Sequence, residues 1–275
     1  MNDLVWIYAV TTGPGPPEAA GLSGVAAEPV RAVEGEGGGE GLTAVVGTVP
    51  AADFAEDPLK DHLEDLRWLE AAARAHHEVI DTVFRHGDTV PLQFATVYRD
   101  DDSVRAVLRE RSADFTGALA RVHGQEEWGV KAYMDPGGGP EASGGPAPSG
   151  GPGGGAAGAS GADSRPGTAY LLRRRAQRDD REQAFQRARG RAEDVRGVLE
   201  SLATRGVAHP PQDPKLAAYQ GWMILNDSFL VERDRAEEFA AAVTSCAEDF
   251  PEVELELSGP WPPYSFVGEV EGRRA

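Results

Sequence analysis

A 31-residue stretch, Gly137–Gly167, is the feature that most limits how this chain can fold. It contains 13 glycines and five prolines and no large apolar side chain. Such a composition cannot bury enough apolar surface to offset the entropy lost on ordering, so we expect a flexible loop. Replacing it with a short Gly/Ser loop should leave thermal stability nearly unchanged, because closure entropy grows only logarithmically with loop length. A phosphate-binding loop is excluded, since no Gly-Lys-Ser/Thr follows the glycines.

The residues before this stretch predict an N-terminal domain, residues 1–124, in which sheet and helices form a mixed α+β unit. Apolar alternation marks its strands, and apolar spacings of three, four or seven mark its helices. The predicted elements are strands at Leu4–Val10, Val25–Val33 and Leu42–Val49, a helix from Asp57 to Gly87, a strand at Pro91–Tyr98, and a helix from Asp102 or Ser103 to Gly124. His77 falls on the apolar stripe of the first helix and is predicted to be a hydrogen-bonded core residue.

The residues after Gly124 predict a second domain, residues 125–275, with the element order β-α-β-β-α-β. The predicted elements are a strand at Trp128–Met134, a helix at Thr168–Thr204, strands at Tyr219–Leu225 and Phe229–Glu232 joined by an Asn226-Asp227 turn, a helix opened by a capping box of Asp234 and Glu237, and a strand at Val253–Leu257. This order is that of a ferredoxin-like domain. The stretch 137–167 is then an insertion in its first strand–helix loop.

The charge of the chain is strongly negative and unevenly distributed. A net charge of −18 argues against general nucleic-acid binding, because phosphates would be repelled. Between Arg165 and Arg205, however, eleven arginines face six acids, while the rest of the chain carries 16 basic and 39 acidic side chains. This basic helix could steer an acidic partner, or it could be a solvated face held by i,i+4 pairs such as Glu182–Gln186.

The cysteine content and the N-terminus indicate a cytoplasmic protein. A single cysteine, Cys246, excludes an internal disulfide. The first ten residues lack the positive region and cleavage site of a signal peptide. No apolar run approaches the roughly 18 residues of a membrane span.

The sequence specifies no catalytic, cofactor-binding or metal site. Four histidines lie on the helix predicted over residues 57–87, but no pair has the i,i+4 spacing of a helical metal site. Cys246 falls on a buried helix face, where a thiol is inert, and no Gly-x-Ser-x-Gly nucleophile turn occurs. We therefore expect a protein that is not an enzyme. A carboxylate pair for acid–base catalysis stays open among the 45 acidic residues.

The segment Leu257–Val267 interleaves three prolines with three aromatic residues. Prolines fix φ and remove backbone donors, so the segment is neither a helix nor a central strand. Aromatic side chains are costly to leave loose in water, so the segment must pack on something. Either it packs the chain end against the second domain's sheet, or it forms part of a surface that binds a partner. The candidate docking residues are Trp261, Pro262, Pro263, Tyr264 and Phe266.

Four segments in order resemble the GvpF/GvpL family of gas vesicle proteins over essentially the whole chain. They are the strand Leu4–Val10 with Leu42–Pro50, the Pro-Leu-x-Phe-x-Thr-Val core of Val90–Tyr98, the strand Glu127–Tyr133, and the terminal segment Gly259–Val267. The sequence departs from the family pattern in the length and glycine content of its insertion.

The resemblance implies a two-domain α+β protein with a ferredoxin-like C-terminal domain. It implies a non-enzymatic role in gas vesicle assembly, through contact with the small hydrophobic shell protein and other accessory proteins, at the vesicle in the cytoplasm. Binding would keep the shell protein soluble, or the chain would be built in as a minor component. The alternative is a ferredoxin-like regulatory module that binds a small ligand.

Overall fold

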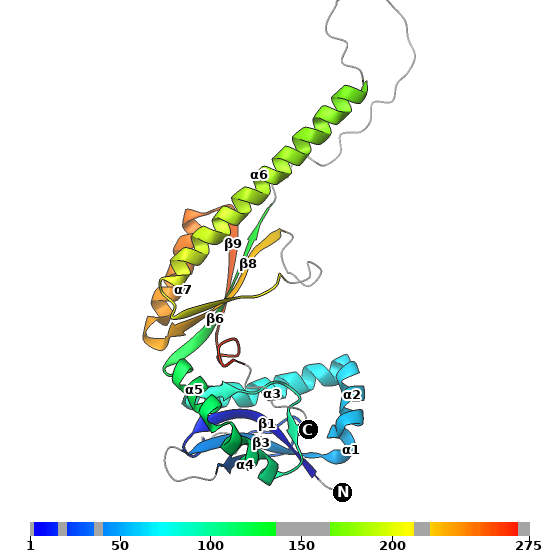
Figure 1. Ribbon diagram of the computed structural model, residues 1–275, viewed down its shortest axis with the longest axis vertical. Helices are drawn as coiled ribbons and strands as arrows, with labels where there is room; N and C mark the ends of the chain where they lie inside the picture. Colours follow the sequence, from blue (N-terminus) through cyan, green and yellow to red (C-terminus); the bar gives the residue numbers. More distant parts are fainter. Residues whose placement is uncertain (1–2, 16–20, 36–40, 136–165, 212–220, 269–275) are drawn as a thin grey trace, which may run out of the picture.

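The computed structural model describes residues 3–15, 21–35, 41–135, 166–211 and 221–268 (Figure 1). These residues form two antiparallel sheets, one in each half of the chain, with helices packed on both. No helix among them is both long and apolar enough to cross a bilayer. The glycine-rich stretch predicted as a flexible loop lies outside the described residues, apart from its last two residues, which begin a helix.

The first sheet has the strand order β2-β3-β1-β4, with β5 also paired to β1. Its strands are β1 (Asp3–Thr12), β2 (Val30–Glu34), β3 (Leu42–Pro50), β4 (Thr89–Pro91) and β5 (Val97–Tyr98). The central strand β1 is apolar on both faces because both faces are covered. Ile7 points into one core and Trp6 and Tyr8 into the other.

Helices cover the two faces of this sheet, which gives three layers. One face packs on α1 (Ala51–Phe54), α2 (Glu56–Glu64) and α3 (Leu66–His86) through buried residues such as Val79 and Ile80. The other face packs on α4 (Asp101–Glu110) and α5 (Ser112–Val122) through residues such as Leu108 and Phe115.

Both long helices predicted in this half are interrupted, so those predictions were wrong in their continuity. Asp65 separates α2 from α3, because its side chain accepts hydrogen bonds from the backbone N–H groups of Arg67 and Trp68 and caps a new helix. Arg111 separates α4 from α5. The cap of α4 is Asp100, not Asp102 or Ser103, and its carboxylate accepts from the Ser103 N–H at 2.8 Å.

Two predicted strands of this half are shorter in the structure. Only the last four residues of the predicted Val25–Val33 segment lie in a strand, β2, because a turn that includes Ala27 at φ 57° precedes it. The predicted strand Pro91–Tyr98 is two short strands, β4 and β5, separated by a bend with Ala95 at φ 66°.

The second sheet has the strand order β7-β8-β6-β9, and every neighbouring pair is antiparallel. Its elements are β6 (Gln125–Met134), α6 (Pro166–Glu200), β7 (Arg205–Ala208), β8 (Trp222–Glu232), the 3-10 turn η2 (Arg233–Arg235), α7 (Ala236–Asp249) and β9 (Val253–Trp261). Residues such as Val195 on α6 and Phe239 on α7 pack on one face, against residues such as Phe229. The first part of α6 projects beyond the sheet (Figure 1).

The structure corrects three details of this half. The Asn226-Asp227 turn is wrong, since both residues lie inside the continuous strand β8, where Arg196 holds Asp227 with hydrogen bonds of 2.6 and 3.1 Å. The strand β7 was missed. It is the second strand of the β-α-β-β-α-β order, and the two strands predicted on either side of Asn226-Asp227 are together the third, β8. The capping box is also wrong, because α7 begins after a 3-10 turn and has no side-chain cap. The Glu182–Gln186 pair is confirmed at 3.0 Å.

Candidate functional site

The C-terminal tail, residues 262–268, leaves the second sheet and packs on the first half of the chain. Its side chains of Phe266 and Val267 are 4% and 5% exposed and belong to the same core cluster as Phe115 and Val122. The Arg121 guanidinium donates to the Val267 carbonyl at 3.0 Å. The tail is therefore bound within its own chain, but on the first half and not only on the second sheet.

The predicted docking residues divide into anchors and exposed rings. Pro262, Pro263 and Phe266 are buried, whereas Trp261 and Tyr264 are 39% and 40% exposed. An exposed aromatic ring is free to contact a partner, and a buried one is not. Only Trp261 and Tyr264 thus remain candidates for direct contact.

Trp261, Tyr264 and His77 form one aromatic cluster, which we call the junction surface. The ring of His77 lies 5.5 Å from that of Trp261 and 6.3 Å from that of Tyr264, nearly parallel to the latter. The His77 Nδ1 is 3.3 Å from the Tyr264 hydroxyl. Burial raises the pKa of Tyr264, and the negative charges of Asp81 and Glu127 raise it further, so the hydroxyl stays neutral.

A buried polar network lies behind this surface and fixes the tail. The Glu127 carboxylate, on β6, is 6% exposed and accepts from the Ser265 N–H at 2.8 Å and from its hydroxyl at 2.7 Å. The Ser265 oxygen is also 3.3 Å from the Ser228 hydroxyl, which contacts His209 Nε2 at 2.9 Å. The sequence pattern contained no signal for this network, because its members are far apart along the chain.

The buried histidine of α3 is His76, so the prediction of His77 as the core residue was wrong by one position. The break at Asp65 starts a new helix and changes which residues face the sheet. His76 Nδ1 accepts from Trp6 Nε1 at 3.0 Å, and its Nε2 lies 3.3 Å from the Leu92 carbonyl. Burial lowers the pKa of His76 to about 4, so the ring is neutral.

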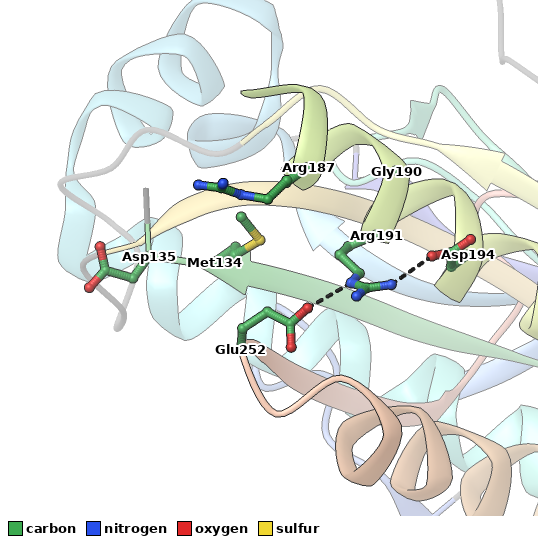
Figure 2. A pocket seen from close by; sticks show the side chains of 7 residues that line it. All are labelled: Met134, Asp135, Arg187, Gly190, Arg191, Asp194 and Glu252. Atoms are coloured by element: carbon green, nitrogen blue, oxygen red, sulfur yellow. Dashed lines mark hydrogen bonds and ion pairs between the residues drawn. The ribbon is translucent and has the colours of Figure 1, made fainter. Parts of the chain in front are cut away.

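A shallow hollow of about 420 Å³ lies between α6 and the ends of β6 and β9 (Figure 2). Its Arg191 is already bound by Glu252 at 2.6 Å and by Asp194 at 3.1 Å. Three carboxylates and two guanidinium groups line it, so its charges largely cancel. It shows no feature that selects a ligand.

The described residues give no support for metal binding or thiol chemistry. They contain no group of three or more histidine, cysteine or acidic side chains that could hold a metal ion. Cys246 is buried, and burial followed by the charge of Asp249 raises the pKa of its thiol, as for an inert packing residue.

The fold is that of known gas vesicle proteins. The crystal structure of GvpF from Anabaena sp. PCC7120 superposes with a TM-score of 0.67 at 15% identity, covering 99% of each chain. That of GvpF from Microcystis aeruginosa gives 0.64 at 17% identity, covering 97% of this chain and 99% of the other.

Sequence comparison gives the family. The model of the gas vesicle synthesis protein GvpL/GvpF family matches residues 4–268. Gas vesicle protein L of Streptomyces sp. (strain CB03234) is 40% identical, with 98% of this chain and 94% of that protein covered. Gas vesicle protein F of the same strain is 30% identical, covering 97% and 100%. The chain belongs to the GvpL/GvpF family, which implies a role in gas vesicle formation.

Proposed function

We propose that this chain is a non-enzymatic accessory protein of gas vesicle assembly that binds the small hydrophobic shell protein in the cytoplasm. Binding would keep that subunit soluble before assembly or carry the chain into the vesicle as a minor component. The observation that supports a binding role is the junction surface, where an exposed tryptophan and an exposed tyrosine adjoin over His77. Tryptophan and tyrosine are enriched in interface hot spots.

The chemistry of the partner follows from the physics of a gas-filled shell. A shell subunit exposes apolar surface and aggregates before assembly. The junction surface offers it apolar contact, and the net charge of −18 opposes self-association of the complex.

The organisation proposed for this role is two domains, residues 1–124 and 125–275. Support for a ferredoxin-like second domain comes from its β-α-β-β-α-β order, its strand order β7-β8-β6-β9 and its two helices on one face. The alternative of a small-ligand regulatory module would require an enclosed polar pocket in this domain. The hollow between α6 and β9 is shallow and charge-balanced, so it does not meet this requirement.

Co-purification with the shell protein from cells tests the proposal. Apolar burial contributes roughly 25 cal/mol per Å², whereas salt screens exposed charges beyond about 8–10 Å, so binding should persist in high salt. Trp261→Ala should reduce the recovered shell protein severalfold. Phe185→Ala is the matched control, because Phe185 is 54% exposed but lies on α6, away from the tail. Thermal melting of each variant separates lost binding from lost folding.

Two results would contradict this assignment. If modest salt abolished recovery, or if Arg173→Ala with Arg174→Ala did so, the basic helix α6 would be the binding element. If no shell protein co-purified with the unmodified chain, the binding function itself would be wrong.

A further inference from the structure

A second hollow, of about 510 Å³, lies where the tail meets the edge strand β7. It is lined by Arg121, Arg205, Gly206, Val207, Ser265, Phe266 and Gly268. Arg121 is on α5 in the first half and Arg205 begins β7 in the second half, so residues from both halves line it. No acidic residue is part of this lining.

Among the described residues, neither guanidinium group at this hollow has a carboxylate partner. Arg121 donates to the Val267 carbonyl, which is a neutral acceptor, and pairs with no carboxylate of the described residues. Arg205 is exposed and forms no ion pair with any residue that the structure describes. In a chain with 45 acids and 27 basic residues, two arginines that line one hollow with no described carboxylate partner are unexpected.

Two described carboxylates close to these residues, Glu127 and Glu200, do not line the hollow. Glu127 accepts both hydrogen bonds from Ser265 and does not line the hollow. Glu200 lies beside Gly206 on the face of β7 that packs toward α6. Arg205 and Val207 alternate to the opposite face, where Val207 packs against the core of the first half.

The hollow of Figure 2 differs from this one in the charges that line it. There, Arg191 and Arg187 share their hollow with Asp135, Asp194 and Glu252. At the tail, the described lining holds two arginines and no carboxylate, and the Ser265 hydroxyl and the backbone of Gly206 and Gly268 add polar groups. Guanidinium groups bind planar or tetrahedral oxyanions through paired N–H donors.

We propose that this hollow is an oxyanion site that takes a carboxylate or phosphate group between Arg121 and Arg205. A bound oxyanion contacts one arginine from each half and so links the two halves next to the tail. Because Arg121 also holds the Val267 carbonyl, the ligand reinforces the attachment of the tail.

Calorimetric titration of the full chain with inorganic phosphate, and separately with succinate, tests the site. The unmodified chain should bind at least one of the two at concentrations of about 10 mM or below, and Arg205→Ala should weaken that binding about tenfold. Arg205 is exposed, so its removal should leave the melting temperature in buffer unchanged. Arg187→Ala, at the charge-balanced hollow, is the matched control and should bind like the unmodified chain.

The two titrants distinguish the source of the oxyanion. Binding of succinate alone assigns the site to carboxylate groups, as on an acidic peptide, and binding of phosphate alone assigns it to phosphorylated ligands. Equal binding by the Arg205→Ala variant and the unmodified chain would overturn the proposal. Failure of both titrants to bind the unmodified chain would overturn it as well.

Discussion

At the scale of single residues, the neighbouring histidines of α3 show how strongly burial sets chemistry. His76 lies among the rings of Trp6, Tyr8 and Phe94, while His77 reaches the junction surface. Both nitrogens of His76 are used by Trp6 and Leu92, so the neutral ring fits its site and the charged ring does not. This residue makes the stability of the first half depend on pH.

The pH dependence of unfolding should carry the signature of His76. Its pKa is about 4 in the folded chain and about 6.5 when unfolded, so the unfolded chain binds more protons between these values. Stability is therefore present above pH 6.5 and lost as the pH falls toward 4. From pH 7 to 4.5 the loss from this group is about 2–3 kcal/mol.

Urea unfolding at the two pH values measures this effect. His76→Gln can keep one donor and one acceptor, and it should reduce the difference between the two pH values by about 2 kcal/mol, although it also lowers stability at pH 7. His62→Gln on α2 is the control and should leave the difference unchanged. An unchanged difference in the His76 variant would show that other groups cause the acid sensitivity.

At the scale of elements, sequence patterns predicted the strands with continuous apolar character and missed those set by distant contacts. The strands β1, β3 and β6 were found because burial imposes their pattern directly. The strand β7 was missed, because Arg-Gly-Val-Ala is too short to show alternation. Asn226 and Asp227 pair with Lys131 and Val130 of β6, and Arg196 binds Asp227, so tertiary contacts override the turn preference of Asn-Asp.

The same limit applies to the candidate site. The proline and aromatic content of the C-terminal segment marked it as a segment that must pack. The local sequence could not show that Phe266 is buried and Trp261 half-exposed, because their partners lie in the first half of the chain. Glu127 could not be distinguished from the other acids, because its partner Ser265 lies 138 residues further along the chain.

Two glycine substitutions, one in a helix and one in a strand, should change the stability of the protein in opposite directions. Gly197 lies inside α6 with open space around its Cα, so Gly197→Ala should stabilise the protein by about 0.5–1 kcal/mol. Gly259 in β9 has φ +129°, and an added Cβ would lie 2.9 Å from the Glu127 carbonyl oxygen, so Gly259→Ala should destabilise it by at least about 2 kcal/mol.

Urea midpoints of the two variants, compared with the unmodified chain, measure these changes. Each variant differs from the unmodified chain by one methyl group, so a change in its urea midpoint reports the backbone conformation at that glycine and the space around it. A stable Gly259→Ala protein would mean that the end of β9 relaxes without disturbing the tail.

At the scale of the whole molecule, the two halves are joined by more than one connection. The chain passes from α5 to β6 at Gly124, whose φ is +67°, and it returns through the tail into the core of the first half. Arg233 adds a contact between the halves, since its guanidinium lies 4.9 Å from the Phe84 ring. The proposed domain boundary at residue 124 therefore separates two sheets, but the core of the first half takes Phe266 and Val267 from the other side of that boundary.

Fragments should show this dependence. Residues 125–261 should give a cooperative thermal transition, because they hold both helices and all strands of the second sheet without the tail. Residues 125–275 should fold too, but should self-associate more, since Phe266 and Val267 lose their cover. Residues 1–124 alone should be the least stable. Light scattering and calorimetry test these rankings, and a monomeric, equally stable 1–124 fragment would contradict them.

The position of Phe266 and Val267 near the end of the chain also determines when, during translation, the core of the first half can be completed. The first half leaves the ribosome early, but two of its core side chains are made more than a hundred residues later. At about 5–20 residues per second, the nascent first half waits roughly seven to thirty seconds for them. A prematurely terminated chain never acquires Trp261 and Tyr264, and so never presents the junction surface. The surface that we propose to receive a shell subunit thus exists only on chains whose translation has reached the tail.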